Sequence, residues 1–155
     1  MKTAIFPGSF DPFTRGHEAL VEQALSLFDK VVIAIGENVN KRSLLSLETR
    51  KRLIEDLYAD NERVECITYS TLTGDAARAA GATVLIRGVR NAIDFEYERT
   101  LAQTNSRLYP EITTVMLFTP PELNDVSSST VRELLSFNRE VDWLLPQNIN
   151  IEDYL

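Results

Sequence analysis

The sequence contains a single cysteine, Cys66, among its 155 residues. One cysteine excludes both a disulfide framework within the chain and a zinc site built from cysteines. Because disulfides persist in oxidising compartments, this composition fits a reducing one. The sequence also lacks any apolar run approaching the roughly 18 residues that a membrane helix needs. Residues 1–5 lead directly into a strand-like segment, without a secretory signal region, so we expect a cytoplasmic protein with no membrane partner.

Positive charge is also in short supply. Lysine and arginine contribute 16 residues against 23 aspartates and glutamates, which gives a formal net charge of −7. Such a chain is a poor candidate for sequence-independent binding to DNA, so no nucleic-acid partner is expected. The hydrophobic fraction of 44% and the charged fraction of 25% are those of an ordinary globular protein. From its length, we expect residues 1–155 to form a single domain.

Short runs rich in β-branched residues alternate with longer helical patterns. The expected strands cover residues 4–6, 31–35, 64–69, 83–87 and 113–118. Several are apolar without alternation, which is typical of strands covered on both faces. Between the strands, apolar residues recur at helical spacing within 20–28, 53–58 and 93–108. Gly81 is expected to end one helix, and Pro110 to close another before the last strand.

This alternation predicts an α/β fold, a Rossmann-like doubly wound domain with a five-stranded parallel sheet. Ligands of such sheets bind at the carboxyl ends of the strands. The residues that directly follow each strand are therefore the candidates for function.

The segment after the first strand, residues 7–17, is too long for a routine turn and contains two glycines and two prolines. The helix that begins near its end would present amide N–H groups to an anion. The chain's only histidine, His17, stands at that helix start, which favours a functional role. Asp11 precedes a proline, which indicates turn chemistry, with a metal-adjacent carboxylate as the alternative. Neither of the common phosphate motifs, G-x-G-x-x-G and G-x-x-x-x-G-K-[ST], is present.

Cationic residues follow the second and fourth strands. Lys41 and Arg42 either contact a phosphate or form a solvated surface pair, and Ser46 is the expected N-cap of the next helix. Arg87 continues an apolar run and, together with Arg90, favours an anion site because an unpaired buried arginine costs desolvation. The alternative for these two arginines is a pair of ion bridges to Asp94, Glu96 or Glu98.

Four consecutive hydroxyl residues, 127–130, follow the fifth strand at a helix start. They either cap that helix or donate hydrogen bonds to phosphates. The loops after the strands thus indicate one shared property, a site for several anionic groups.

Two of these segments resemble known signatures. The runs GSFDP at 8–12 and TRGH at 14–17 resemble the T/H-x-G-H signature of the nucleotidylyltransferase superfamily, and VSSSTVR at 126–132 resembles its second signature, I-S-S-S/T-x-V-R/K. The resemblance is narrowed from the superfamily to one family by three further features: Lys41, the block at 86–90 and the segment at 94–98. Over residues 2–149 the chain is similar to the bacterial phosphopantetheine adenylyltransferases.

The resemblance implies a transfer of AMP from ATP to 4′-phosphopantetheine, which gives dephospho-coenzyme A and pyrophosphate in the penultimate step of coenzyme A synthesis. It implies that His17 stabilises the transition state. It implies an ATP site made of Ser9, Phe10, His17, Gly88, Val89, Arg90, Glu98, Leu123, Asn124, Asp125, Val126, Ser127, Ser128 and Ser129. It implies a phosphopantetheine site made of Ser9, Lys41, Thr73 and Arg87. Members of the family use Mg²⁺ and are typically homohexamers.

The expected chemistry suits these residues. A phosphate monoester has a second pKa of about 6, so it is mostly a dianion at pH 7 and needs no general base to become a nucleophile. Mg²⁺ is expected to be held mainly by the substrate phosphates and water, with no protein ligand. Two alternatives stay open. One is a nucleotidylyltransferase for nicotinamide mononucleotide or glycerol phosphate, and the other is a nucleotide-binding module without catalysis.

Overall fold

The computed structural model describes all 155 residues. Five strands form one sheet: β1 (Thr3–Gly8), β2 (Lys30–Gly36), β3 (Val64–Tyr69), β4 (Val84–Val89) and β5 (Thr113–Phe118). Every pairing is parallel and the strand order is β3-β2-β1-β4-β5, so the predicted parallel sheet is confirmed. The order reverses between β1 and β4, and this switch point is where parallel sheets open a crevice for ligands.

Five α-helices connect or follow the strands: α1 (Arg15–Leu27), α2 (Leu47–Leu57), α3 (Thr73–Ala79), α4 (Ala92–Leu108) and α5 (Ser128–Ser136). Three short 3₁₀ turns follow β5 and α5: η1 (Pro121–Leu123), η2 (Asp142–Leu144) and η3 (Ile151–Asp153). Ser46 caps α2 as expected, because its side chain accepts the backbone N–H of Thr49. Gly81 follows α3 with a φ of 69°, a left-handed conformation that glycine adopts without strain.

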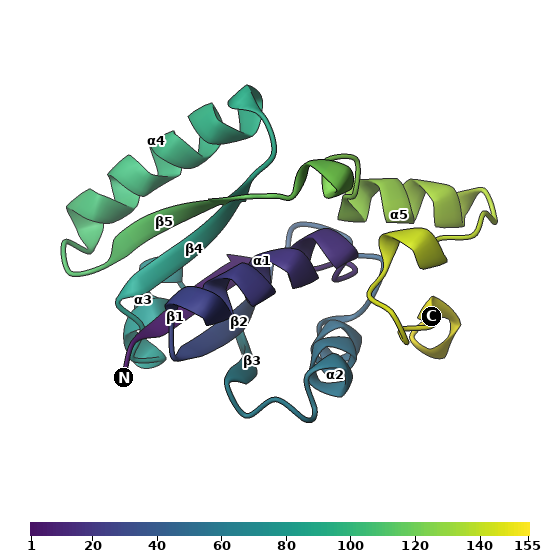
Figure 1. Cartoon of the computed structure of the whole chain (residues 1–155), viewed down its shortest axis with the longest axis horizontal. Coiled ribbons are helices and arrows are strands. Elements are labelled where there is room, and N and C mark those ends of the chain that lie inside the picture. The colour runs from purple at the N-terminus through teal and green to yellow at the C-terminus, as the bar shows by residue number, and fades with distance from the viewer.

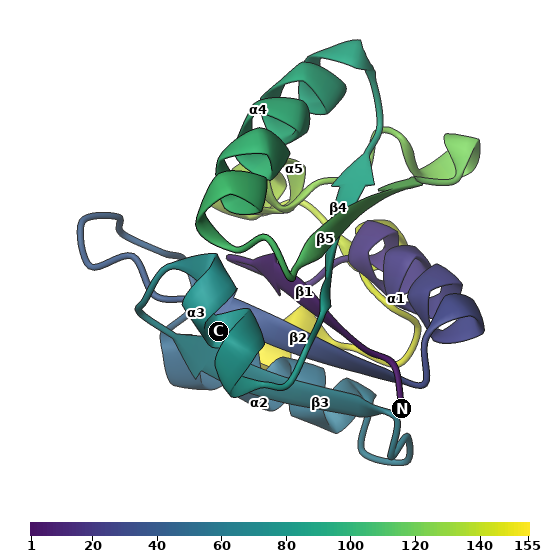
Figure 2. The ribbon, with the colours of Figure 1, turned by 90° about the vertical axis from the view of Figure 1, so that its left-hand side faces the viewer.

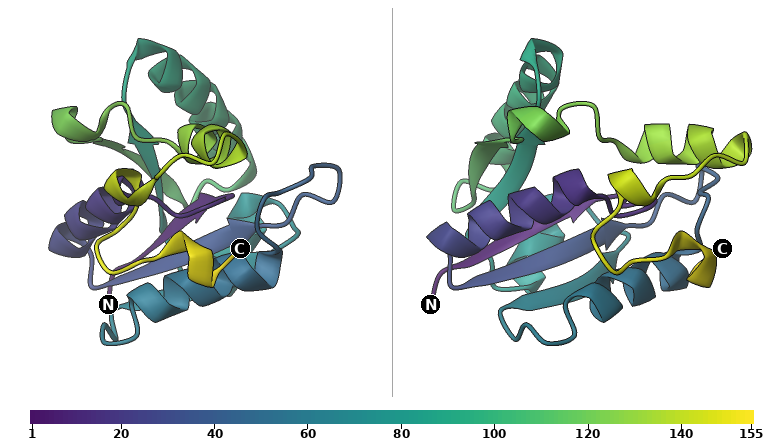
Figure 3. Two further views of the ribbon diagram at one scale, coloured as in Figure 1. Left: turned by 90° about the vertical axis from the view of Figure 1, so that its right-hand side faces the viewer. Right: turned by 45° about the vertical axis from the view of Figure 1, so that its right-hand side comes forward.

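The helices cover both faces of the sheet, as a doubly wound fold requires (Figures 1 and 2). Neighbouring residues of β1 and β2 point to opposite faces, and the buried side chains accordingly form two clusters. The larger cluster packs α1, α2, α5 and the C-terminal segment against one face. The smaller packs α3 and the connection from α4 to β5 against the other. Figure 3 shows the C-terminal segment, in yellow, running past α1 and α2.

Helix α4 exposes most of the apolar residues that recur along it. Ile93, Tyr97 and Leu108 expose 82%, 64% and 52% of their surfaces, and the only buried residue of the helix is Glu98. Helix α4 therefore carries its apolar stripe on an outer surface. None of the helices combines the length and the hydropathy of a membrane-spanning segment.

Candidate active site

A cavity of about 310 Å³ opens at the switch point, beyond the carboxyl ends of β1 and β4. Its walls come from four parts of the chain that are separate in the sequence: the stretch from the end of β1 into α1, the stretch from the end of β4 into α4, Thr119 after β5, and the start of α5. The lining residues are Phe6, Pro7, Gly8, Ser9, Phe10, Gly16, His17, Leu20, Arg87, Gly88, Arg90, Asp94, Glu98, Thr119, Val126, Ser127 and Ser128.

His17 is fixed in this cavity by the N-terminal cap of α1. Its Nδ1 accepts the backbone N–H of Thr14 at 2.9 Å, while the Thr14 hydroxyl accepts the backbone N–H of His17, so the two residues form a reciprocal capping box. A ring nitrogen that accepts a hydrogen bond carries no proton, so the neutral ring bears its proton on Nε2. Helix capping therefore selects the tautomer of the histidine.

The pKa of His17 is lowered to about 4, first by burial and then by the positive charges of Arg90 and Arg87. Three aromatic rings enclose the imidazole: Phe10, Phe13 and Phe6 have ring centroids 5.0, 5.3 and 6.2 Å from it. Phe10 itself lies at a φ of 48°, a left-handed conformation that costs energy for a bulky residue and that tends to persist at functional sites. At neutral pH the ring is thus an uncharged hydrogen-bond donor.

Side chains from other segments hold the loop after β1 by its carbonyl groups. Arg50 of α2 donates from Nη1 to the Ser9 carbonyl at 2.8 Å and is itself buried. From α5, Arg132 donates to the Asp11 carbonyl at 2.8 Å, and the Ser128 hydroxyl donates to the Pro12 carbonyl at 2.7 Å. Because its carbonyls are bonded in this way, the loop is a fixed part of the cavity wall.

Both arginines of the β4 segment are paired with carboxylates. Arg87 bonds Glu98 through two N–H···O contacts of 2.6 and 2.8 Å, and its Nη1 donates to the Pro7 carbonyl at 3.0 Å. Arg90 bonds Asp94 at 3.1 Å. The ion bridges considered from the sequence are therefore formed. Anion binding by either arginine stays a prediction.

A second cavity of about 250 Å³ adjoins the first and shares Pro7, Arg87 and Glu98 with it. Its remaining walls come from the starts or ends of α3 and α4 and from β4 and β5, and they are largely apolar, with Leu72, Leu85, Leu101 and Leu108 among them. Thr73 also lines this cavity, and its hydroxyl lies 3.1 Å from that of Tyr69. The Arg87–Glu98 ion pair therefore stands between a polar and an apolar chamber.

The residues predicted for the site divide into three groups. The first cavity gathers Ser9, Phe10, His17, Arg87, Gly88, Arg90, Glu98, Val126, Ser127 and Ser128. The second adds Thr73. Neither cavity is lined by Lys41, Val89, Leu123, Asn124, Asp125 or Ser129. Lys41, Asn124, Asp125 and Ser129 are exposed, whereas Val89 is buried in the sheet.

Sequence reasoning did not assign some lining residues to the site. Thr119 directly follows β5, so its position at a strand end was a usable signal. Leu20 is hydrophobic and on a core stripe, and nothing in the sequence separates it from the other core residues of α1. Arg50 supports the loop from behind, which only the folded chain reveals.

Comparison with known proteins sets this geometry in context. A family model described as cytidylyltransferase-like matches residues 5–134. A phosphopantetheine adenylyltransferase of Porphyromonas gingivalis is 51% identical over 149 residues, covering 96% of this chain and 97% of the relative. One of Bacteroides thetaiotaomicron is 46% identical over 151 residues, covering 97% of this chain and 99% of the relative. The chain belongs to the phosphopantetheine adenylyltransferase family.

A more distant solved structure shares the fold of this phosphopantetheine adenylyltransferase family member. The bifunctional NMN adenylyltransferase/ADP ribose pyrophosphatase of Francisella tularensis superposes with a TM-score of 0.74 at 18% identity. The match covers 97% of this chain but only 46% of that larger one. At this identity the likeness concerns the fold alone, and it is consistent with the Rossmann-like sheet described above.

Proposed function

We propose that the chain transfers the adenylyl group of ATP to 4′-phosphopantetheine, giving dephospho-coenzyme A and pyrophosphate. Family membership supports the reaction, and one structural observation carries its assignment to this site. A polar chamber containing His17 and the start of α5 adjoins an apolar chamber across a shared arginine. Such a pair of chambers suits a nucleoside triphosphate on one side and an acceptor with a long, weakly polar arm on the other.

The reaction is a direct displacement at the α-phosphorus of ATP. The acceptor phosphate oxygen forms the new bond to phosphorus, the bond to the β-phosphate bridging oxygen breaks, and pyrophosphate leaves with that electron pair. The acceptor is mostly a dianion at pH 7, so no proton has to be removed from it. The protein's task is to align two anions and to stabilise the charge that develops on the leaving group.

His17 acts as a hydrogen-bond donor in this scheme. Its lowered pKa keeps the ring neutral at physiological pH, and the bond from Thr14 to Nδ1 leaves Nε2–H free to donate. A general base would need an unprotonated nitrogen directed at the acceptor. We assign Nε2–H to the ATP phosphates, where it stabilises the transition state.

The start of α5 supplies further donors. Ser127 caps the helix by accepting the backbone N–H of Thr130 at 3.1 Å, and Ser127 and Ser128 line the cavity. A helix N-terminus carries a partial positive charge and unsatisfied amide groups, both of which favour phosphate. Arg90 and Arg87 add formal charge beside it, and Arg87 spends only three of its five N–H donors on Glu98 and Pro7.

We assign the apolar chamber to the pantetheine arm, with Thr73 and Arg87 at its walls. Lys41 would reach the acceptor phosphate only from the exposed segment between β2 and α2, so its assignment rests on the family resemblance. Among the ATP residues implied by the family, those that line neither cavity likewise rest on resemblance: Val89, Leu123, Asn124, Asp125 and Ser129.

Mg²⁺ fits this site as a companion of the ATP phosphates. The cavity offers hydroxyl, amide and cationic donors, and its two carboxylates, Asp94 and Glu98, are bonded to arginines. This donor set suits phosphate oxygens, which then hold the ion together with water. When bound, the ion neutralises charge on the departing pyrophosphate.

The experiment that tests the function measures pyrophosphate release from ATP with 4′-phosphopantetheine, nicotinamide mononucleotide or glycerol phosphate as acceptor. We expect release only with phosphopantetheine. Faster pyrophosphate release with another acceptor would show that this other acceptor is the substrate. ATP binding without turnover on every acceptor would make the chain a binding module.

We also propose that the chain self-associates, as the homohexamers of the family do, and that it works in the cytoplasm. Exposed apolar side chains on α4, together with Phe118 at the end of β5, support an interface, because large apolar and aromatic groups are favoured at the centre of one. The use of ATP and the single cysteine favour the cytoplasmic setting.

A further inference from the structure

Asp11 is a buried carboxylate that the proposed mechanism does not use. Only 4% of its surface is exposed. One carboxylate oxygen accepts the backbone N–H of Leu44 and the other accepts that of Leu45, both at 2.8 Å. These amides lie 33 and 34 residues further along the chain, so the contact joins two separate loops and is more than local turn chemistry.

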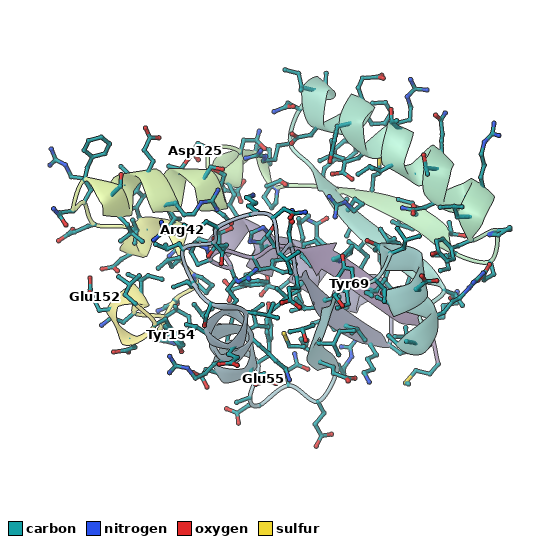
Figure 4. All side chains as sticks on the ribbon, turned by 180° about the vertical axis from the view of Figure 1, so that it is seen from behind. Arg42, Glu55, Tyr69, Asp125, Glu152 and Tyr154 are labelled. Atoms are coloured by element: carbon teal, nitrogen blue, oxygen red, sulfur yellow. The ribbon has the colours of Figure 1, made fainter.

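The two amides belong to the segment that carries Lys41, residues 37–46, which lies between β2 and α2. At its first end, Glu37 donates its backbone N–H to the backbone carbonyl of Tyr69 at 2.8 Å. Between Glu37 and Leu44, the backbone and Asn38 side-chain contacts are internal to the segment, such as Lys41 N–H to the Asn38 carbonyl at 3.1 Å. Figure 2 shows the segment projecting from the body of the molecule, and Figure 4 labels Arg42 on it. Asp11 therefore anchors the second end.

The backbone of Asp11 directly follows Ser9 and Phe10, which line the first cavity. Its carbonyl accepts Arg132 from α5, and two residues earlier the Ser9 carbonyl accepts Arg50 from α2. The side chain of Asp11 thus ties the Lys41 segment to the same rigid loop that forms the substrate cavity.

We propose that Asp11 is a positioning residue for the second substrate, which holds the Lys41 segment at a fixed place relative to the substrate cavity. The inference rests on the proposed function, because it takes Lys41 to contact phosphopantetheine. Lys41 lies only three positions before Leu44, whose amide is anchored, a reach of roughly 10 Å along the backbone. Without this anchor, Lys41 samples positions away from the acceptor phosphate. The fraction of protein molecules in the conformation that binds phosphopantetheine is then lower.

The first experiment compares Asp11→Ala and Asp11→Asn with the wild type in steady-state pyrophosphate release. Asp11→Ala should raise the KM for phosphopantetheine about tenfold, the scale of one lost charge-assisted hydrogen bond. The KM for ATP should change less than about twofold, since the loop that carries Ser9 and Phe10 keeps its backbone bonds to Arg50 and Arg132 in the variant. Asp11→Asn should recover part of the loss, because its carbonyl oxygen still accepts one of the two N–H groups. Equal rises in both KM values would overturn the proposal.

Two matched measurements separate positioning from other roles. In a Lys41→Ala background, Asp11→Ala should raise the KM for phosphopantetheine by less than about twofold, because the residue to be positioned is gone. If the two substitutions instead raise this KM by independent factors that multiply, the proposal is contradicted. The Mg²⁺ concentration that gives half-maximal rate should be the same in Asp11→Ala and the wild type. A large increase would make Asp11 a metal ligand instead.

Hydrogen exchange gives a test that does not depend on turnover. Asp11→Asn should accelerate exchange at the amides of Leu44 and Leu45 while leaving β1 and β2 protected. Unchanged exchange at those two amides would overturn the anchor itself, even if Asp11→Ala fails to fold. If the wild type releases no pyrophosphate with phosphopantetheine, the proposed function fails. If the wild type does release pyrophosphate, but Asp11→Ala does not raise the KM for phosphopantetheine more than that for ATP, only the positioning role fails.

Discussion

His17 shows how a single hydrogen bond decides between two chemical roles. Histidine in general titrates near neutrality and serves as either acid or base. Here the backbone N–H of Thr14 occupies Nδ1, and burial with two nearby arginines lowers the ring's pKa to about 4. What is left is a neutral donor at Nε2, which matches a reaction whose nucleophile needs no base.

The first prediction concerns that pKa. Since the chain has one histidine, its Cε1–H proton gives a single NMR signal, which should titrate near pH 4 in the free protein. The ordinary value of 6.5 applies to the unfolded chain, so as the pH falls protons bind the unfolded state first. The free energy of unfolding should therefore be unaffected by the titration of His17 above pH 6.5, and it should decrease as the pH is lowered from 6.5 to 4. His17→Gln should lack this part of the pH dependence; a midpoint near 6.5 would contradict the burial argument.

The second prediction concerns catalysis by the same residue. His17→Ala should lower kcat by roughly 10²–10³, the range for losing one transition-state donor, with a much smaller change in ATP affinity. His17→Asn or His17→Gln should regain part of the rate, because an amide donates but is no base. Single-turnover AMP transfer at saturating substrates, from about pH 6 to 9, measures this. If all three variants are equally inactive and the wild-type rate follows deprotonation of a histidine, the donor role is wrong.

The third prediction compares two adjacent exposed residues, Lys41 and Arg42. Lys41→Ala should raise the KM for phosphopantetheine about tenfold or more and leave that for ATP nearly unchanged, as expected for a lost phosphate contact. Arg42→Ala removes the same charge one position away and should change neither KM appreciably. Similar effects from both variants would show that only the general positive charge of the segment matters.

At the scale of elements, two helices begin with the same cap in different places. Ser46 accepts the N–H of Thr49 at the start of α2, and Ser127 accepts that of Thr130 at the start of α5, both at 3.1 Å. Only Ser127 lines the cavity. The pair therefore separates what a cap contributes to stability from what it contributes to binding.

The fourth prediction uses that pair. Ser46→Ala and Ser127→Ala should each lower the free energy of unfolding by about 1 kcal/mol, the usual cost of an N-cap serine. Only Ser127→Ala should also weaken ATP binding, because it removes a hydroxyl from the cavity and loosens the helix start beside the phosphates. Denaturant unfolding and calorimetric ATP titration measure the two effects. Equal ATP affinities for both variants would remove α5 from the proposed phosphate site.

For the whole molecule, the sequence predicted what local chemistry determines. The five strands are short runs rich in β-branched residues, and the caps at Ser46 and Gly81 follow from local hydrogen bonding and backbone freedom. The helical spacing predicted an apolar stripe on α4, and the structure leaves that stripe exposed, because periodicity shows that a face is apolar but not what covers it. The sequence offered Glu98 as one of three carboxylates for the two arginines of the β4 segment, but the contacts of Arg87 with the Pro7 carbonyl and of Asp11 with Leu44 join residues that only the fold brings together.

The fifth prediction is that the exposed stripe on α4 is covered by another copy of the chain. Sedimentation at micromolar concentration should show a species well above the 17.5 kDa monomer. Ile93→Lys, which places a charge on the most exposed member of the stripe, should shift the distribution toward the monomer. A wild type that sediments only as the monomer would refute self-association.

The ion pair of Arg87 and Glu98 has a thermodynamic consequence for how the two substrates influence each other. Both residues line both chambers, so a ligand that draws the guanidinium away from the carboxylate on one side reshapes the wall on the other. The two binding equilibria are then linked by a coupling free energy, and linkage requires this coupling to be reciprocal. Whatever factor ATP imposes on the affinity for the acceptor, the acceptor must impose on the affinity for ATP.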